Sequence, residues 1–195
     1  MAVVWTKALF DLAYDFGAEP DGHPNTREEI RLHYERAALW PDMVRRAGFF
    51  AQHFGLTSTS RVLLVGAGFG WTVEALGNLG VRAIGTDTSP YVQANKEADV
   101  MNEDSMTNAS RNRVKSALGG VTLVITEDVM TSLNDAECLA LRAQLAKFNA
   151  PLCHFVTEFA NPSPPFNFNS KSLADWKTLF PVDTIIADGY KYRSL

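Results

Sequence analysis

RVLLVGAGFGWTVEALGNLGVRAIGTDT, which spans residues 61–88, decides the fold of this chain. Its opening residues, 61–65, form an apolar run typical of a buried strand, and segment 71–79 has the apolar spacing of a helix. A second apolar run over 81–86 predicts another strand. A strand, a glycine-rich turn, a helix and a second strand that ends on a carboxylate form the front half of a nucleotide-binding βαβ unit.

Three glycines make up the turn after the first strand, at Gly66, Gly68 and Gly70. Because glycine has no Cβ, such a turn can be tight and a ligand can approach its backbone closely. Asp87 follows about 20 residues after Gly66, the spacing at which a carboxylate reaches the ribose hydroxyls of a bound nucleotide. A dinucleotide-binding turn has a small residue where this chain has Trp71. The pattern therefore favours an adenosine-containing cofactor other than NAD.

These motifs resemble those of the class I S-adenosylmethionine-dependent methyltransferases. The first family motif, an apolar strand followed by G-x-G-x-G, is matched by VLLVGAGFG, and the second, an acidic residue at the end of the next strand, by Asp87 in IGTDTSPYV. The resemblance implies that S-adenosyl-L-methionine is the cofactor, with its amino-acid end on the glycine turn and its ribose on Asp87. The cofactor-binding residues that it implies are Gly66, Ala67, Gly68, Phe69, Gly70, Trp71, Asp87, Thr88, Glu127 and Asp128.

Strands and helices alternate along the rest of the chain. Besides the two strands above, we expect strands over 121–126, 152–159 and 184–187. This alternation predicts an α/β fold of the doubly wound type, with a mostly parallel sheet and helices on both of its faces.

The expected helices are marked by apolar spacing, capping residues and prolines. A helical pattern begins near Thr26, and we expect it to break at Pro41 and to resume over 43–54. Pro90 suits the first turn of a helix that we expect to run to about Asn102. Further helices are expected over 111–118, 131–148 and 172–180.

We expect a single domain over residues 1–195, with an N-terminal helical cap over 1–58 and a cofactor-binding α/β core over 59–195. The resemblance implies a sheet of seven strands, whereas five are convincing in this sequence. A strand between 87 and 121 is either missing or hidden in a polar stretch, and the chain after Ala187 has room for only part of the family's closing hairpin. We therefore expect a version of the fold that is trimmed at its C-terminus.

Composition excludes several other classes of protein. The chain has a net charge of −4 and no basic cluster larger than the pair Arg45-Arg46, which disfavours a nucleic-acid partner. No segment approaches the roughly 20 apolar residues that span a bilayer, and the N-terminus lacks the features of a secretory signal. Cys138 and Cys153 have no closely spaced metal-ligating partner, so we expect reduced packing residues and no metal. The expected location is the cytoplasm; the oligomeric state stays open.

Candidate catalytic groups lie at the ends of two expected strands. Glu127 and Asp128 follow the strand over 121–126, and the resemblance implies contacts there to cofactor and substrate; a solvated pair leading into the next helix is the alternative. Glu158 stands near the end of the next strand, where substrate contact is expected. His154 lies within that strand, where a histidine is more often a hydrogen-bonded core residue than a base.

One alternative function rests on Ser163-Pro164-Pro165-Phe166. This stretch resembles the motif with which amino-group nucleic-acid methyltransferases receive the target amine. A proline-rich loop is also common without that role, and no basic face accompanies it here.

A second alternative is a non-catalytic S-adenosylmethionine-binding or interaction protein. Leu64 stands where the family's first motif has an acid, and Thr122 where the family often has Asp. The intact glycine turn and Asp87 favour an enzyme instead. We therefore predict a methyltransferase that acts by direct displacement, for which positioning is often sufficient, on a small-molecule acceptor that the sequence does not identify.

Overall fold

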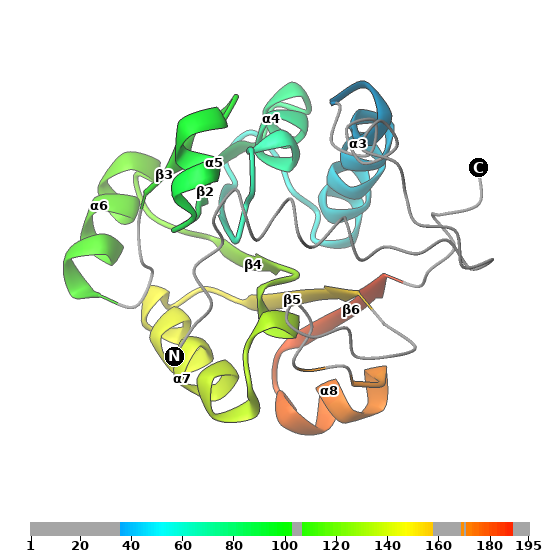
Figure 1. Cartoon of the computed structure of the whole chain (residues 1–195). Coiled ribbons are helices and arrows are strands. Elements are labelled where there is room, and N and C mark those ends of the chain that lie inside the picture. Colours follow the sequence, from blue (N-terminus) through cyan, green and yellow to red (C-terminus); the bar gives the residue numbers. More distant parts are fainter. Residues whose placement is uncertain (1–35, 103–106, 158–168, 170, 189–195) are drawn as a thin grey trace.

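The computed structural model describes residues 36–102, 107–157, 169 and 171–188. Its centre is a six-stranded sheet in which all neighbouring strands are parallel, in the order β3-β2-β1-β4-β5-β6 (Figure 1). The strands are β1 (Arg61–Val65), β2 (Arg82–Thr86), β3 (Val100–Met101), β4 (Leu123–Glu127), β5 (Leu152–Thr157) and β6 (Thr184–Asp188). The helices are α3 (Arg36–His53), α4 (Trp71–Asn78), α5 (Pro90–Asn95), α6 (Asn108–Leu118), α7 (Asp135–Leu145) and α8 (Leu173–Leu179), with short 3-10 turns η1 (Val129–Ser132) and η2 (Ala146–Phe148).

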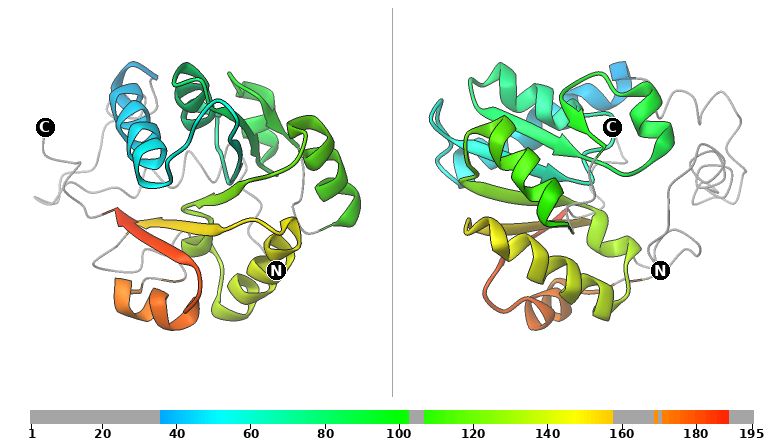
Figure 2. Two further views of the ribbon diagram at one scale, coloured as in Figure 1. Left: turned by 180° about the vertical axis from the view of Figure 1, so that it is seen from behind. Right: turned by 90° about the vertical axis from the view of Figure 1, so that its left-hand side faces the viewer.

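Both faces of the sheet are buried under helices. Side chains of α3, α4 and α5 form one apolar cluster with the sheet, and side chains of α6, α7 and α8 form a second cluster on the opposite face. Figures 1 and 2 show α3 and α4 on one side of the strands and α7 and α8 on the other. Strands covered on both faces are apolar along most of their length, which is why β1 contains the continuous run VLLV. The doubly wound α/β prediction is confirmed.

The strand order reverses at β1, whose neighbours are β2 on one side and β4 on the other. In an open parallel sheet, ligands bind outside the carboxyl ends of the strands at such a reversal. The glycine turn follows β1, Asp87 follows β2, and Glu127 ends β4. The fold therefore gathers these three predicted features at one edge of the sheet.

The expected break at Pro41 is wrong, because α3 runs through it. A proline inside a helix removes one backbone hydrogen bond and bends the axis locally. Ala47 and Phe50, on the following turns of α3, are fully buried in the core. Their packing outweighs the loss of one hydrogen bond.

The expected helix from Pro90 to about Asn102 is also wrong beyond Asn95, because β3 follows it. This strand is the element that the sequence hid between residues 87 and 121. Two residues are too few to show an alternating pattern, and only the burial of Val100, which is 2% exposed, marks it as part of the sheet. The sheet has six strands where five were expected; the expected C-terminal trimming concerns residues 189–195, which lie outside the described part.

The boundaries of other elements moved by a few residues. The strand expected over 121–126 begins at Leu123. At Thr122 the side chain bonds to β1: its hydroxyl accepts a hydrogen bond from the Arg61 backbone N–H at 2.8 Å. The helix expected over 131–148 is divided into η1, α7 and η2, and α7 begins with a capping box between Asn134 and Glu137.

A chain of buried polar side chains links β4, β5 and α7 near the start of β6. His154 is fully buried, with Nδ1 3.0 Å from Thr126 Oγ1 and Nε2 3.1 Å from Asp183 Oδ2. Arg142 donates two hydrogen bonds of 2.8 Å to the same carboxylate. The prediction that His154 is a hydrogen-bonded core residue is confirmed.

Both cysteines are buried and free, as predicted. Burial raises the pKa of Cys138 to about 12, and it has the same effect on the pKa of Cys153. A thiol with so high a pKa is not a nucleophile at neutral pH, which supports a packing role. Among residues 36–102, 107–157, 169 and 171–188, no helix combines the length and apolar character that a bilayer crossing requires.

The buried carboxylate predicts acid-sensitive stability. Burial alone would raise the pKa of Asp183, but the hydrogen bonds from His154 and Arg142 outweigh it and lower the pKa from 3.8 to about 2. The ionised form therefore stabilises the fold above its unfolded pKa, and this contribution disappears as the pH falls through the folded pKa. We expect Asp183→Asn to lower the free energy of unfolding by about 2 kcal/mol at pH 6. Urea titrations between pH 6 and pH 2 should show this difference shrink below pH 4; a constant difference would show that the charge is not its cause.

Candidate functional site

The glycine turn is fastened to the end of β2 by backbone hydrogen bonds. The N–H groups of Gly66 and Ala67 both donate to the carbonyl of Thr86, at 2.9 and 3.2 Å. All three glycines of the turn have positive φ, between 53° and 89°, which a residue with a Cβ rarely adopts. The turn leads directly into α4, whose first residue is Trp71.

The three glycines are small for different reasons, which the sequence did not distinguish. A Cβ on Gly66 would collide with Val129 Cγ2, and a Cβ on Gly70 would lie 2.7 Å from Val100 Cγ2. Among the residues that the structure describes, a Cβ on Gly68 would meet nothing within 4 Å. Gly66 and Gly70 are therefore required by the packing of the protein itself. Of the three glycines, only Gly68 faces open space that a ligand can enter.

Asp87 lies beside that open glycine and holds the turn. Its Oδ2 accepts a hydrogen bond from the Gly68 N–H at 3.1 Å, and its Oδ1 accepts one from the Ser89 N–H at 2.8 Å. Burial raises the pKa of Asp87, and hydrogen bonds from Ser89, Gly68 and Thr88 partly offset the shift. Each carboxylate oxygen has further lone pairs, which can accept from the hydroxyls of a ribose. The predicted ribose carboxylate and the open turn thus fit an adenosine cofactor.

The other predicted cofactor residues differ in exposure. Thr88 is exposed, whereas Phe69 is half-buried and lies with its ring centroid 5.2 Å from that of Trp71. The Trp71 side chain is 7% exposed, and its Nε1 has no hydrogen-bond partner in the described part of the chain. A buried donor without an acceptor is costly to a fold. The first residue of α4 therefore carries a buried indole N–H without an acceptor among the described residues.

Glu127 is buried at the end of β4 and bound by two other elements. Its Oε1 accepts a hydrogen bond of 2.6 Å from Arg46 Nη1 of α3 and one of 2.8 Å from Thr72 Oγ1 of α4. The guanidinium of Arg46 also lies over the ring of Phe155, 4.3 Å from its centroid. Burial by itself lowers the pKa of Arg46, but the charges of Glu127 and Asp128 outweigh it and raise the pKa. This ion pair fixes α3 against the carboxyl ends of the strands.

Asp128 occupies a left-handed turn directly after β4, with φ 55°. Its N–H donates to the carbonyl of Phe155, and its own carbonyl accepts from Thr131 Oγ1 at 2.6 Å. Aspartate is among the few residues that tolerate this backbone conformation. The structure brings Glu127 and Asp128 to the edge that holds the glycine turn; Glu158 and residues 163–166 lie outside its described part.

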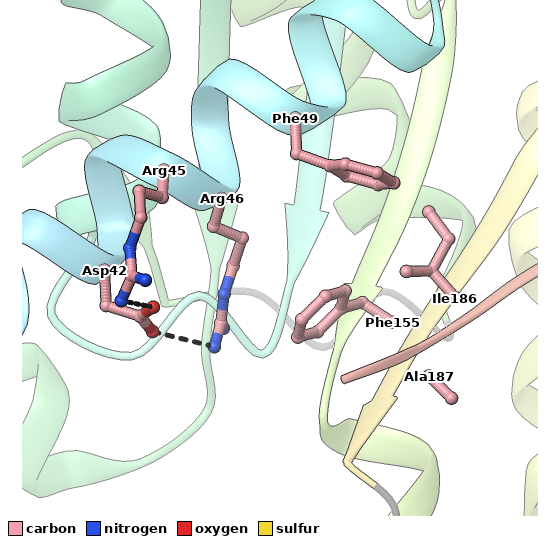
Figure 3. A pocket seen from close by; sticks show the side chains of 7 residues that line it. All are labelled: Asp42, Arg45, Arg46, Phe49, Phe155, Ile186 and Ala187. Carbon is pink, nitrogen blue, oxygen red and sulfur yellow. Dashed lines mark hydrogen bonds and ion pairs between the residues drawn. The ribbon is translucent and has the colours of Figure 1, made fainter. Parts of the chain in front are cut away.

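A cavity of about 210 Å³ opens between α3 and the ends of β5 and β6 (Figure 3). Its lining consists of Asp42, Arg45, Arg46, Phe49, Phe155, Ile186 and Ala187. Sequence reasoning noted Arg45 and Arg46 only as a small basic pair. No local pattern indicates their position, since Arg46 meets Glu127 across 81 residues of sequence.

The ion pair between Arg46 of α3 and Glu127 of β4 predicts that substitutions of these two residues have non-additive effects on the free energy of unfolding. Removal of one partner of a buried pair leaves the other charge uncompensated, so we expect Arg46→Met and Glu127→Met each to cost about 3 kcal/mol. The double variant removes both charges and should be more stable than either single variant. Urea unfolding of the four proteins tests this in a double-mutant cycle; additive costs would show that the pair does not hold α3 in place.

The fold has counterparts among solved structures. No protein-family model and no curated protein matches the chain. A SAM-dependent methyltransferase from Archaeoglobus fulgidus is similar in structure with a TM-score of 0.54 and 16% identity, over 79% of this chain and 71% of that one. The magnesium protoporphyrin IX methyltransferase ChlM from Synechocystis PCC 6803, solved with bound SAM, has a TM-score of 0.53 and 17% identity, over 88% of this chain and 84% of that one. The chain has the fold of the class I S-adenosylmethionine-dependent methyltransferases.

Proposed function

We propose that the protein is an S-adenosylmethionine-dependent methyltransferase that acts on a small-molecule acceptor. The observation that carries this proposal is the open face of Gly68 beside the Asp87 carboxylate, at the edge where the strand order reverses. A cytoplasmic location, which the composition favours, is part of the proposal.

The chain's own residues would bind and orient. Asp87 would accept hydrogen bonds from the ribose hydroxyls, and the open backbone of Gly68 would admit the amino-acid end. The unsatisfied Trp71 N–H and the first turn of α4, where backbone N–H groups have no helical partner, favour a carboxylate nearby. When bound, S-adenosylmethionine supplies a methyl group on a sulfonium, an electrophile that needs no activation by the protein. Catalysis would then rest largely on the alignment of the acceptor.

Glu127 suits a positioning role better than that of a general base. Two donors, Arg46 Nη1 and Thr72 Oγ1, already occupy Oε1. These two contacts fix the carboxylate between α3 and α4, which is what a positioning residue provides. Asp128 and Glu158 are the remaining candidates for contact with the acceptor.

The first motif lacks its acidic residue, which was one reason to consider a protein that binds S-adenosylmethionine without catalysis. Leu64 is fully buried in the core, so no carboxylate at that position reaches the turn. Asp87 reaches it from β2 instead and accepts the hydrogen bond from Gly68. Asp87, the acid of the second motif, thus also holds the turn, and this favours cofactor binding. Formation of S-adenosylhomocysteine in the presence of acceptor would distinguish an enzyme from a protein that only binds.

The ribose contact predicts a loss of affinity in Asp87→Ala. We expect isothermal titration to show that binding of S-adenosylhomocysteine weakens by about 1–3 kcal/mol, the cost of buried hydrogen bonds that lose their acceptor. Asp99→Ala, a change of an exposed carboxylate before β3, is the control and should bind as the wild type does. Equal affinity in the two variants would contradict the ribose assignment.

The open face of Gly68 predicts that Gly68→Val abolishes binding, because the new side chain fills the space that the cofactor needs. A side chain at φ 53° is strained wherever it stands, so the control must carry the same strain. Gly55→Val provides it: Gly55 has φ 58°, also faces open space, and lies after α3 away from the turn. We expect circular dichroism to show both variants folded and titration to show binding in Gly55→Val alone. Binding in Gly68→Val would reduce the turn to a structural element.

A further inference from the structure

We propose that the cavity between α3 and β5–β6 receives an acceptor with a flat apolar body and a carboxylate. This inference rests on the proposed function and names the chemical class of its acceptor. Figure 3 shows the four lining side chains of α3 on one side of the cavity and those of the two strands on the other.

The apolar part of the lining suits a flat group. Phe49 is 44% exposed and stands at the cavity, while Ile186 and Ala187 are half-buried on the opposite side. Phe155 is 5% exposed, because the guanidinium of Arg46 covers one part of its ring and the edge-on ring of Phe50 another. Aromatic and aliphatic side chains on two sides bury a planar apolar body well.

The charged part of the lining has two cations and one anion. Arg46 is held by the buried Glu127, and this pair is costly to break. Arg45 is different: its side chain is 50% exposed and its pair with Asp42, at 3.0 Å, lies on the surface. Surface pairs are weak and exchange their partners readily. The carboxylate of a ligand in the cavity can therefore compete with Asp42 for the guanidinium of Arg45.

A cationic ligand fits less well. The carboxylate of Asp42 already faces both Arg45 and Arg46, at 3.0 and 3.5 Å. An ammonium or amidinium placed against Asp42 would meet those two guanidinium groups as well. A guanidinium also offers a planar pair of donors that matches a carboxylate. The lining thus favours an anion.

The cavity lies on the strand next to the one that carries Glu127. Phe155 is the register partner of Glu127, and Ile186 is the register partner of Phe155. β5 is two strands away from β1, so the axes of these two strands lie about 10 Å apart in the sheet. A molecule held at Arg45 can reach toward the turn from there.

Three probes of nearly equal shape test the proposal: benzoate, benzamide and benzamidine, which are anionic, neutral and cationic. Ligand-observed NMR on the full-length protein, with and without S-adenosylhomocysteine, gives their dissociation constants. We expect benzoate to bind roughly tenfold more tightly than benzamide, as one charge-assisted hydrogen bond predicts, and benzamidine to bind most weakly. Equal binding of all three, or a preference for benzamidine, would overturn the proposal.

Arg45→Gln tests the residue that the proposal names. We expect it to remove most of the roughly tenfold preference for benzoate and to leave benzamide unchanged. Lys177→Gln removes an exposed positive charge of α8, on the other face of the sheet, and is the matched control. A similar loss in both variants would mean that net charge, and not the cavity, attracts benzoate.

The cofactor titration separates the two proposals. If S-adenosylhomocysteine binds but Arg45→Gln does not alter benzoate binding, the anionic acceptor class is wrong and the methyltransferase proposal stands. If benzoate binds through Arg45 and S-adenosylhomocysteine does not bind, the proposed function fails, and with it the identification of the cavity as an acceptor site.

Discussion

The hydrogen bond from the Gly68 N–H to the Asp87 carboxylate is the contact on which the site depends. It joins the turn after β1 to the end of β2, and the Thr86 carbonyl adds two backbone hydrogen bonds to the same turn. An ionised carboxylate in a largely buried position is held there by backbone donors, which offset part of its desolvation. The turn is therefore shaped by the same side chain that we propose binds the cofactor.

The ion pair of Arg46 and Glu127 connects α3 to the same edge of the sheet. A buried pair contributes little net stability compared with apolar residues, but it allows few alternative arrangements once α3 is docked. Because Thr72 shares the same carboxylate oxygen, α3, β4 and the first turn of α4 meet at one atom. The glycine turn and the cavity beside α3 thus share a common support.

A second network of polar side chains contains the residue types of a catalytic triad but lies where no substrate reaches it. A hydroxyl, an imidazole and a carboxylate follow one another at Thr126, His154 and Asp183, as in an acid-base triad. Thr126 and His154 are fully buried, and the Asp183 side chain is 4% exposed. Because a substrate cannot reach it, this hydrogen-bond network has a structural role: it links α7 and the start of β6 to the centre of the sheet.

The sequence by itself determined the β1-α4-β2 unit, the glycine turn and the position of Asp87, because these depend on local periodicity, on backbone conformation and on a fixed spacing. Five of the six strands were predictable for the same reason. The two-residue strand β3 was not, since its only sign is the burial of Val100 against elements distant in sequence. The tertiary structure alone decided that Arg46 meets Glu127 and that Arg45 borders a cavity. Such contacts join residues tens of positions apart, and no local pattern records which of them the packing of helices on a sheet will bring together.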